Sequence, residues 1–306
     1  MSEVYAYYQG KIVKEDDVKI SVRSKAFNYG LGVFEGIRAY WDDDAQQLYG
    51  FKLKEHYERL KESAKTVNLD FDLSVDDLIK GTVELLKANN CRTTTYLRPI
   101  VYNDALDIGP TLDVKDVKVV IYTQPLNKYA GKSELSVGVT SWKRISNNQL
   151  PPRTKATAAY MNSALAALET KRAGFDEAIF LTDGDHVCEG SGENIFMFRK
   201  GKLITPPTSD NILEGITREL VMKLAKEDLG LEVVERSISR SELYVADEVF
   251  FSGTAMEVTP IVEVDHRTIG TGHEGEVCKQ IKQLFFGLTV GKNPKYAESC
   301  TPVYDK

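Results

Sequence analysis

The sequence contains little cysteine and little histidine. Among its 306 residues are four cysteines and four histidines, and no two cysteines form a Cys-x-x-Cys pair. Scattered thiols at this density are typical of reduced cytosolic proteins rather than of secreted domains held by disulfides. The histidines also lack the spacing of metal ligands. We therefore expect a cytoplasmic protein with neither a disulfide framework nor a metal site.

Long apolar stretches are also missing. The chain starts Met1-Ser-Glu-Val-Tyr5, which lacks the basic start and apolar core of a signal peptide. No later apolar run approaches the length of a membrane span. The formal net charge is −6 and the pI is near 5.5, so the surface as a whole repels nucleic acid and anionic membranes. These properties argue against both as partners.

The composition that remains is that of a folded protein, with 42% hydrophobic and 27% charged residues, and the length fits two domains. The polar segment 124–132, interrupted by Pro125 and Gly131, is the best candidate for a linker. We accordingly expect a small α/β domain over 1–124, an interdomain loop over 125–132 and a larger domain over 133–306.

Hydrophobic periodicity predicts the elements of both parts. Strands are expected over 5–8, 11–13, 33–41, 48–51, 95–102, 117–123, 135–142, 177–182, 194–199 and 248–251. Helices are expected over 54–68, from a capping box at Ser74 and Asp77 to about 89, and over 157–172, 217–229 and 277–288. This order indicates an α+β fold whose second part is β-rich and barrel-like, with helices outside.

Lys155 begins an unusual segment, Lys155-Ala-Thr-Ala-Ala-Tyr160, which follows Pro151-Pro152. Most lysines are solvated surface charges, but the alanines here indicate burial. A buried lysine loses stabilisation of its charge, so its amine becomes a nucleophile that can form an imine. Tyr160 is close enough in sequence to bond the same ligand.

Glu189 precedes a glycine-rich stretch, Gly190-Ser-Gly192, that by itself is a common loop pattern. Its functional interpretation is electrostatic, because a carboxylate beside a pyridine nitrogen favours the protonated ring by roughly 1–3 pKa units. Glu193 and Asn194 are expected to bond the loop to itself.

Two later turns are rich in amide donors. Gly215-Ile-Thr-Arg218 opens a predicted helix, whose N-terminus presents unpaired N–H groups to an anion. Ser252-Gly-Thr254 ends a predicted strand and offers a second turn of this kind. An amine, a carboxylate and two phosphate-binding turns are together the components of a pyridoxal 5'-phosphate site.

The stretch Gly30-Leu-Gly-Val-Phe-Glu-Gly36 resembles a dinucleotide-binding loop only superficially. Its glycine spacing is one residue too long, and no buried strand precedes it. We reject that interpretation.

Seven blocks of the sequence, in order along nearly the whole chain, resemble those of branched-chain amino-acid aminotransferases, which belong to the fold-type IV group of pyridoxal-phosphate enzymes. The blocks are 27–38, 55–60, 96–99, 155–162, 189–194, 215–218 and 247–260. The resemblance implies a small α/β N-terminal domain and a larger barrel-like C-terminal domain with outer helices.

The resemblance also implies residue roles for the cofactor. Lys155 would hold the cofactor as an imine and move the proton, Glu189 would face the ring nitrogen, and Tyr160 the ring hydroxyl. The residues implied to bind the phosphate are Arg59, Thr217, Thr254 and the Ile216 amide.

The substrate pocket follows from the same resemblance. The implied lining residues are Phe34, Gly36 and Arg38 on one strand and Tyr96 and Arg98 on another, with the backbone of Thr254 and Ala255 for the α-carboxylate. Arg98, bonded to Tyr96 when idle, is expected to bind the second carboxylate of glutamate. Tyr29 would reach the pocket of a neighbouring subunit, so a homodimer at least is implied, with a hexamer of dimers left open.

One stretch departs from the family's pattern. Where the bacterial enzymes usually carry a short Gly-x-Gly loop after the arginine-proline pair, this chain has Asn103-Asp-Ala-Leu-Asp-Ile-Gly109. We expect transamination of leucine, isoleucine or valine with 2-oxoglutarate. The alternatives are an (R)-amine or D-amino-acid aminotransferase of the same fold, an aminodeoxychorismate lyase, or a non-catalytic binding protein, which the retained lysine disfavours.

Overall fold

The computed structural model describes residues 3–113, 116–126 and 131–305 and has two compact units. The first unit comprises Met1–Asn127, Thr154–Ala158 and Gly287–Lys306, and the second comprises Lys128–Arg153 and Ala159–Phe286. The predicted domains are each continuous in sequence, whereas the first unit also takes two short segments from the C-terminal half of the chain. The predicted interdomain loop includes residues 127–130, which lie outside the described residues.

The first unit is built on an antiparallel sheet in the order β17-β5-β4-β6-β7-β1-β2, with β3 paired to β6. β1 and β2 form the predicted opening hairpin, in which Tyr5 lies opposite Lys14. The strands of this sheet are β1 (Tyr5–Tyr8), β2 (Lys11–Lys14), β3 (Gly32–Phe34), β4 (Ile37–Asp42), β5 (Gln47–Phe51), β6 (Thr95–Asn103), β7 (Val117–Pro125) and β17 (Cys300–Pro302).

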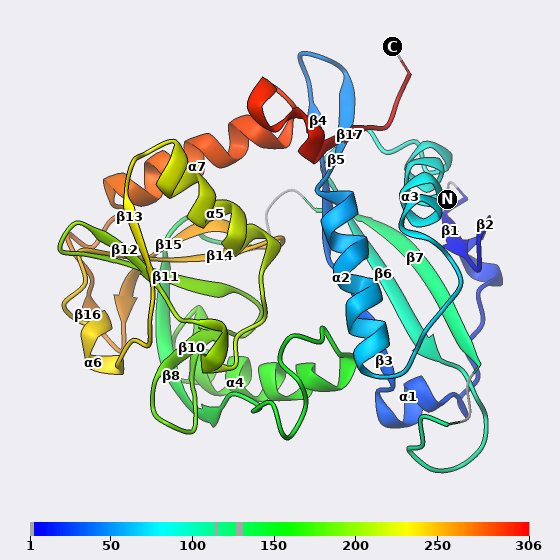
Figure 1. Ribbon diagram of the computed structural model, residues 1–306, viewed down its shortest axis with the longest axis horizontal. Coiled ribbons are helices and arrows are strands. Elements are labelled where there is room, and N and C mark those ends of the chain that lie inside the picture. Colours follow the sequence, from blue (N-terminus) through cyan, green and yellow to red (C-terminus); the bar gives the residue numbers. More distant parts are fainter. Residues whose placement is uncertain (1–2, 114–115, 127–130, 306) are drawn as a thin grey trace. The chain divides into compact units, whose positions relative to one another are not determined.

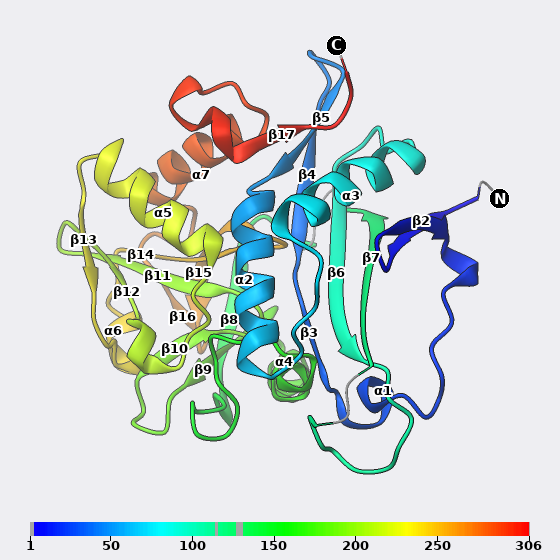
Figure 2. The ribbon, with the colours of Figure 1, turned by 45° about the vertical axis from the view of Figure 1, so that its right-hand side comes forward.

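Two helices, α2 (Leu53–Thr66) and α3 (Val75–Ala88), pack on one face of this sheet (Figures 1 and 2). Helix α2 follows the predicted apolar spacing, since Tyr57 and Leu60 are both fully buried. Helix α3 begins at the predicted capping box, in which Ser74 Oγ accepts the amide of Asp77 and the Asp77 carboxylate accepts that of Ser74. The apolar core lies between these helices and the sheet.

The predicted strand over 33–41 is wrong in one respect, because it is broken at Glu35 and Gly36 into β3 and β4. Both pieces keep the same partner strand, with Phe34 opposite Ile100 and Ile37 opposite Leu97. Pro99 of β6 accepts a hydrogen bond from the Glu35 amide at 2.9 Å but has no N–H to return. The ladder is therefore interrupted where the glutamate lies.

Helix α1 (Lys25–Tyr29) and strand β17 of the first unit were not predicted. The short helix α1 precedes β3, and β17 adds the C-terminal part of the chain beside β5 (Figure 1). The segment after β17 is held by Tyr304, whose hydroxyl donates to the Cys91 carbonyl at 2.8 Å. The Arg92 guanidinium lies 3.7 Å from the centre of the Tyr304 ring. Because β17 and Tyr304 are far in sequence from the residues they contact, no local pattern predicts these contacts.

The second unit contains a curled mixed sheet in the order β10-β9-β8-β15-β14-β11-β12-β13, with β16 paired to β15 (Figure 1). β8 runs parallel to both β9 and β15, and β12 parallel to β13. The strands are β8 (Leu135–Lys143), β9 (Glu177–Leu181), β10 (Val187–Gly190), β11 (Asn194–Arg199), β12 (Lys202–Thr205), β13 (Glu232–Glu235), β14 (Glu248–Gly253), β15 (Glu257–Val264) and β16 (Arg267–Thr268).

The helices of the second unit confirm the predicted ones to within a turn. They are α4 (Tyr160–Arg172), which packs on β8 and β9, α5 (Ile216–Glu227), which packs on β13 and β14, α7 (Glu276–Thr289) and the unpredicted α6 (Arg240–Leu243). None of the helices in the described part of the chain combines the length and the apolar character needed to cross a lipid bilayer.

Two of the predicted loops are shorter than expected. Glu189 and Gly190 end strand β10, and Ser252 and Gly253 end strand β14. The carboxylate of Glu189 is consequently presented by a strand rather than by a loop.

We expect opposite effects from alanine at two helical glycines. A Cβ at Gly81 of α3 would lie 2.2 Å from the ring of Tyr7, whereas at Gly287 of α7 it meets no described atom within 4 Å. Overpacking should lower the free energy of unfolding of Gly81→Ala by about 1–3 kcal/mol, more than the roughly 1 kcal/mol gained in helix propensity. The free energy of unfolding of Gly287→Ala should rise by up to about 1 kcal/mol. Urea unfolding measures both changes, and equal stabilisation of the two variants would contradict the packing of α3 on β1.

Candidate active site

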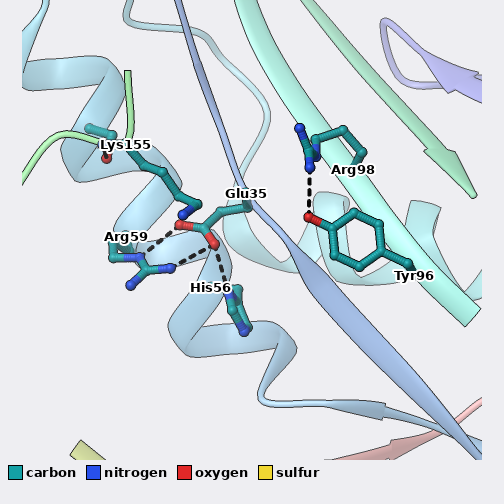
Figure 3. Close-up of polar contacts among 7 residues, drawn as sticks. Glu35, His56, Arg59, Tyr96, Arg98 and Lys155 are labelled. Atoms are coloured by element: carbon teal, nitrogen blue, oxygen red, sulfur yellow. Dashed lines mark hydrogen bonds and ion pairs between the residues drawn. The ribbon is translucent and has the colours of Figure 1, made fainter. Parts of the chain in front are cut away.

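Lys155 lies on a segment of the first unit that is held between β3 and α2 (Figure 3). Its carbonyl oxygen accepts the amide of Phe34 at 3.0 Å, and its own amide donates to Ser63 Oγ at 3.2 Å. The next residue, Ala156, forms an antiparallel bridge with Val33. The backbone of the predicted imine lysine is therefore fixed on two sides.

The side chain of Lys155 is half-buried and reaches a cluster of charged groups. Its Nζ lies 5.1 Å from the centre of the Phe34 ring and points toward Glu35 and Arg59 (Figure 3). Arg59, predicted as a phosphate ligand, is on α2. The structure thus brings these two predicted cofactor residues to one place.

Glu35 is the fully buried centre of this cluster (Figure 3). Arg59 donates from Nε to Oε1 at 2.7 Å and from Nη2 to Oε2 at 2.9 Å. His56, one turn earlier on α2, lies with Nδ1 2.7 Å from the same Oε2. Sequence reasoning missed both Glu35 and His56, because nothing local distinguishes a glutamate in a strand from a surface residue.

Burial and charge act in opposite directions in this cluster. Burial alone would raise the pKa of Glu35, but the Arg59 charge and the hydrogen bonds from His56 and Arg59 outweigh it and hold that pKa well below its usual range. Burial lowers the pKa of His56, and its contact with Glu35 does not compensate. We infer a charged glutamate, a charged arginine and a neutral histidine that donates from Nδ1.

Several of the residues predicted to bind substrate share one face of the first sheet. Side chains alternate along a strand, and Ile37, Ala39 and Leu97 face the helices, so Arg38, Tyr96 and Arg98 face the other way. Arg38 lies opposite Tyr96 in the strand register. Arg38, Tyr96 and Arg98 therefore lie on one face, although β3 and β4 replace the single predicted strand. Of the other predicted substrate residues, Tyr29 is on α1, and Thr254 and Ala255 belong to the second unit.

Arg98 is held as predicted. Its Nη2 donates to the Tyr96 hydroxyl at 2.8 Å (Figure 3), and its guanidinium carbon lies 4.4 Å from the centre of the Phe34 ring. Gly36 lies beside this pair, where a Cβ would come within 2.3 Å of the same hydroxyl. Any larger residue at position 36 would displace Tyr96.

Tyr29 is on α1 and is tied to the loop that departs from the family's pattern. Its hydroxyl accepts the amide of Gly109 at 3.1 Å. The fully buried Lys25 pairs with Asp107 of the same loop at 2.9 Å and donates to Thr111 Oγ1 at 2.8 Å. This loop is therefore attached to α1 through both Tyr29 and Lys25.

Glu189, in the second unit, is a buried carboxylate bonded at both oxygens. Arg144 pairs with its Oε1 at 2.9 Å, and its Oε2 accepts the Asn194 amide at 3.1 Å and the Leu213 backbone amide at 3.0 Å. Donors to both oxygens favour the charged form. Asn194 bonds this glutamate, which goes beyond its predicted role within the loop, and Arg144 was missed because it follows a strand with no motif around it.

The predicted phosphate turns of the second unit lie at element ends. Gly215 is the N-cap of α5, with Ile216 and Thr217 in its first turn, and a Cβ there would lie 2.0 Å from Asn194 Oδ1. Arg218 instead donates to the Pro206 carbonyl and pairs with Glu235. Thr254 and Ala255 form the turn between β14 and β15, and Tyr160 begins α4.

Each unit contains groups of the kinds that pyridoxal phosphate requires. The first unit has the Lys155 amine and the fixed Arg59 guanidinium. The second has the buried Glu189 carboxylate and a helix N-terminus whose glycine cap carries no side chain. The buried Ser252 Oγ, beside the predicted Thr254 turn, has no hydrogen-bond partner among the described residues. No group of His, Cys, Asp and Glu side chains that could hold a metal ion occurs in the described ranges.

Residues 32–264 match the family model for amino-transferase class IV. A probable branched-chain-amino-acid aminotransferase of Aquifex aeolicus is 45% identical over 303 residues, covering 99% of this chain and 97% of its own length. The chain therefore belongs to the class IV aminotransferases and, within them, to the branched-chain amino-acid aminotransferase family.

Solved structures agree with this assignment. The branched-chain aminotransferase of Thermoproteus uzoniensis, crystallised with norvaline, matches with a TM-score of 0.95 and 42% identity over 99% of this chain and 100% of that one. The branched-chain amino acid aminotransferase of Thermobaculum terrenum, solved in its PLP-bound holo form, matches with a TM-score of 0.94 and 34% identity over 99% of both chains. The predicted fold class is confirmed.

The neutral state of His56 predicts a pH dependence of stability. Since burial lowers its pKa in the folded state from 6.5, the unfolded chain takes up a proton first as the pH falls below that value, and stability falls with it. His56→Asn keeps a donor near Nδ1 but does not titrate. The free energy of unfolding of this variant should therefore not show the fall with pH, up to about 1.4 kcal/mol per pH unit, that one such proton contributes.

Urea unfolding of wild type and His56→Asn between about pH 5 and pH 7 measures this slope. His273→Asn, at a side chain that is 80% exposed, is the control for losing a histidine. Parallel curves for wild type and His56→Asn would contradict the assignment.

Proposed function

We propose that this chain transfers the amino group between L-leucine, L-isoleucine or L-valine and 2-oxoglutarate, with pyridoxal 5'-phosphate as cofactor. The observation that carries the proposal is the Lys155 cluster, in which an anchored amine lies beside a fixed guanidinium and the Phe34 ring. The relatives support the proposal because their sequence identity to this chain extends over nearly its full length.

The cofactor, when bound, supplies an electron sink that stabilises the charge left on the substrate Cα after its proton departs. Lys155 Nζ would hold the cofactor through its aldehyde, and the same amine would carry the proton that leaves the substrate Cα to the cofactor. Arg59 binds the phosphate as a charge-assisted donor. The half-buried position of the amine keeps competing water from most of its surroundings.

Glu189 keeps a proton on the ring nitrogen. Arg144 and Asn194 hold this carboxylate charged and fixed, and an opposite charge in close contact favours ring protonation by roughly 1.4–4 kcal/mol. Tyr160 donates to the ring hydroxyl. The Ile216 amide, Thr217 and Thr254 add phosphate contacts, as the N-terminus of α5 suits an anion.

Substrate recognition uses the face of the first sheet that carries Arg38, Tyr96 and Arg98. Phe34 contacts the aliphatic side chain, and Gly36 leaves space beside it. Arg98 exchanges its hydrogen bond with Tyr96 for the second carboxylate of glutamate, which could not be buried without a partner. Arg38 lines the same face, and the Thr254 and Ala255 amides hold the α-carboxylate.

The proposed assembly is a homodimer at least, with a hexamer of dimers left open. Exposed apolar side chains support this, since Phe27 on α1 is 73% exposed and Ile108 in the adjoining loop is 94% exposed. Tyr29 lies between them in sequence and is the residue that reaches the neighbouring subunit. The four free cysteines are consistent with a cytoplasmic location.

Lys155→Ala should abolish turnover, because both the covalent attachment and the proton carrier are lost. The proton transfer alone is commonly worth about 10²–10⁴-fold. Turnover of leucine with 2-oxoglutarate and the absorbance spectrum of the purified protein give the two readouts. Lys54→Ala, at an exposed position of the same helix that carries Arg59, is the control. A Lys155→Ala variant that keeps both activity and the cofactor band would mean that another lysine carries the cofactor.

Arg98→Leu should separate the two substrates. Rates with glutamate and 2-oxoglutarate should fall several-fold or more, because their second carboxylate loses its partner, while the leucine half-reaction changes little. Single half-reactions followed through the cofactor spectrum measure each rate. Arg92→Leu removes an arginine that stacks on Tyr304, outside the proposed site, and serves as control. Equal losses for leucine and glutamate would show that Arg98 binds the shared α-carboxylate.

A further inference from the structure

Glu35 has no part in the roles described so far, although it is the most completely buried charged group around Lys155. We propose that Glu35, held by His56, is the positioning residue that fixes Arg59 for the cofactor phosphate. The inference rests on the proposed function in one respect, namely that Arg59 binds this phosphate.

The geometry of the ion pair supports orientation. Arg59 engages Glu35 side-on, through Nε and Nη2, so the plane and the rotation of the guanidinium are both set by the carboxylate. An arginine on a helix otherwise samples many rotamers, which a bound phosphate would have to select. The pair makes that selection before the ligand arrives.

Glu35 is fixed by its backbone, by burial and by His56. The Glu35 amide donates to the Pro99 carbonyl at the break between β3 and β4, and the side chain is 0% exposed. His56 bonds the oxygen that also accepts Nη2 of Arg59. Both partners are presented by one face of α2, one turn apart (Figure 3). A shift of Glu35 would therefore move the arginine with it.

The same short stretch of backbone also places Lys155. The amide of Phe34 holds the Lys155 carbonyl, and the carboxylate of the following residue holds Arg59. Two adjacent residues thus set the positions of the group that takes the cofactor aldehyde and the group that takes its phosphate. Their separation is built into the chain before any ligand binds.

If Glu35 acted only as a counter-charge to Arg59, its removal would change phosphate binding in the opposite direction. A carboxylate beside Arg59 reduces the net positive charge available to a phosphate, so on charge alone its removal should strengthen phosphate binding. If Glu35 positions Arg59, its removal should weaken binding instead. The sign of the change in affinity therefore distinguishes the two roles.

The test is Glu35→Gln in the full-length protein, stripped of cofactor and titrated with pyridoxal phosphate and, separately, with pyridoxal, which lacks the phosphate. By analogy with residues that orient metal ligands, whose loss costs about 10–100-fold in affinity, we expect pyridoxal phosphate affinity to fall roughly tenfold or more. Pyridoxal affinity should stay within about twofold, since Lys155 is retained.

Arg59→Gln and the double variant complete a cycle. Arg59→Gln should weaken only pyridoxal phosphate, and adding Glu35→Gln to it should have little further effect, because the residue that Glu35 acts through is gone. If Arg59→Gln does not discriminate between the two ligands, the phosphate role in the proposed function fails. If Arg59→Gln discriminates and Glu35→Gln does not, only the present inference fails.

His56→Phe provides a second variant should Glu35→Gln fail to fold, because it removes one bond to the carboxylate and leaves the ion pair. His56→Phe should lower the affinity for pyridoxal phosphate less than Glu35→Gln does and leave the affinity for pyridoxal unchanged. Tighter pyridoxal phosphate binding in either variant, or equal losses for both ligands, would overturn the proposal. Thermal melts of each apo variant establish that it is folded.

Discussion

The need to keep a carboxylate charged away from water organises much of this molecule. An isolated carboxylate in the interior would take up a proton or destabilise the fold, so each buried one requires donors around it. In the first unit Arg59 and His56 meet this requirement for Glu35, and in the second Arg144, Asn194 and the Leu213 amide meet it for Glu189. The backbone on either side must bring those donors together, which constrains where β3, β10 and α2 begin and end.

The first sheet is irregular beside the Glu35 carboxylate. The strand from β3 to β4 would be continuous if only its apolar residues mattered, since both pieces keep one register with β6. Pro99 removes the return hydrogen bond at the position opposite Glu35. Alternation along the strand puts Glu35 on the same face as Val33 and Ile37, toward α2, while Gly36 on the other face leaves room for Tyr96. The interruption in the ladder therefore leaves the charged cluster in place.

How far the sequence predicts the molecule depends on whether a signal is local. The capping box at Ser74, the apolar spacing of α2, the segment around Lys155 and the glycine-rich stretch after Glu189 are each readable within a few residues, and the resemblance to a family added Arg59. The partners of those groups were not readable. Arg59 and Glu35 are 24 positions apart, and neither has an unusual neighbour. Strand β17 pairs with a strand from the opposite end of the chain, which no periodicity can indicate.

The discontinuous first unit has a consequence for the order of folding. Domains generally fold as they are synthesised, N-terminal parts first. Here the sheet that begins with Tyr5 acquires its Lys155 segment only after most of its strands have been made, and its last strand only when residue 302 is complete. The intervening second unit can become compact in the meantime. The first unit is thus started first and finished last, and a nascent chain can hold no cofactor through Lys155 until roughly its first half exists.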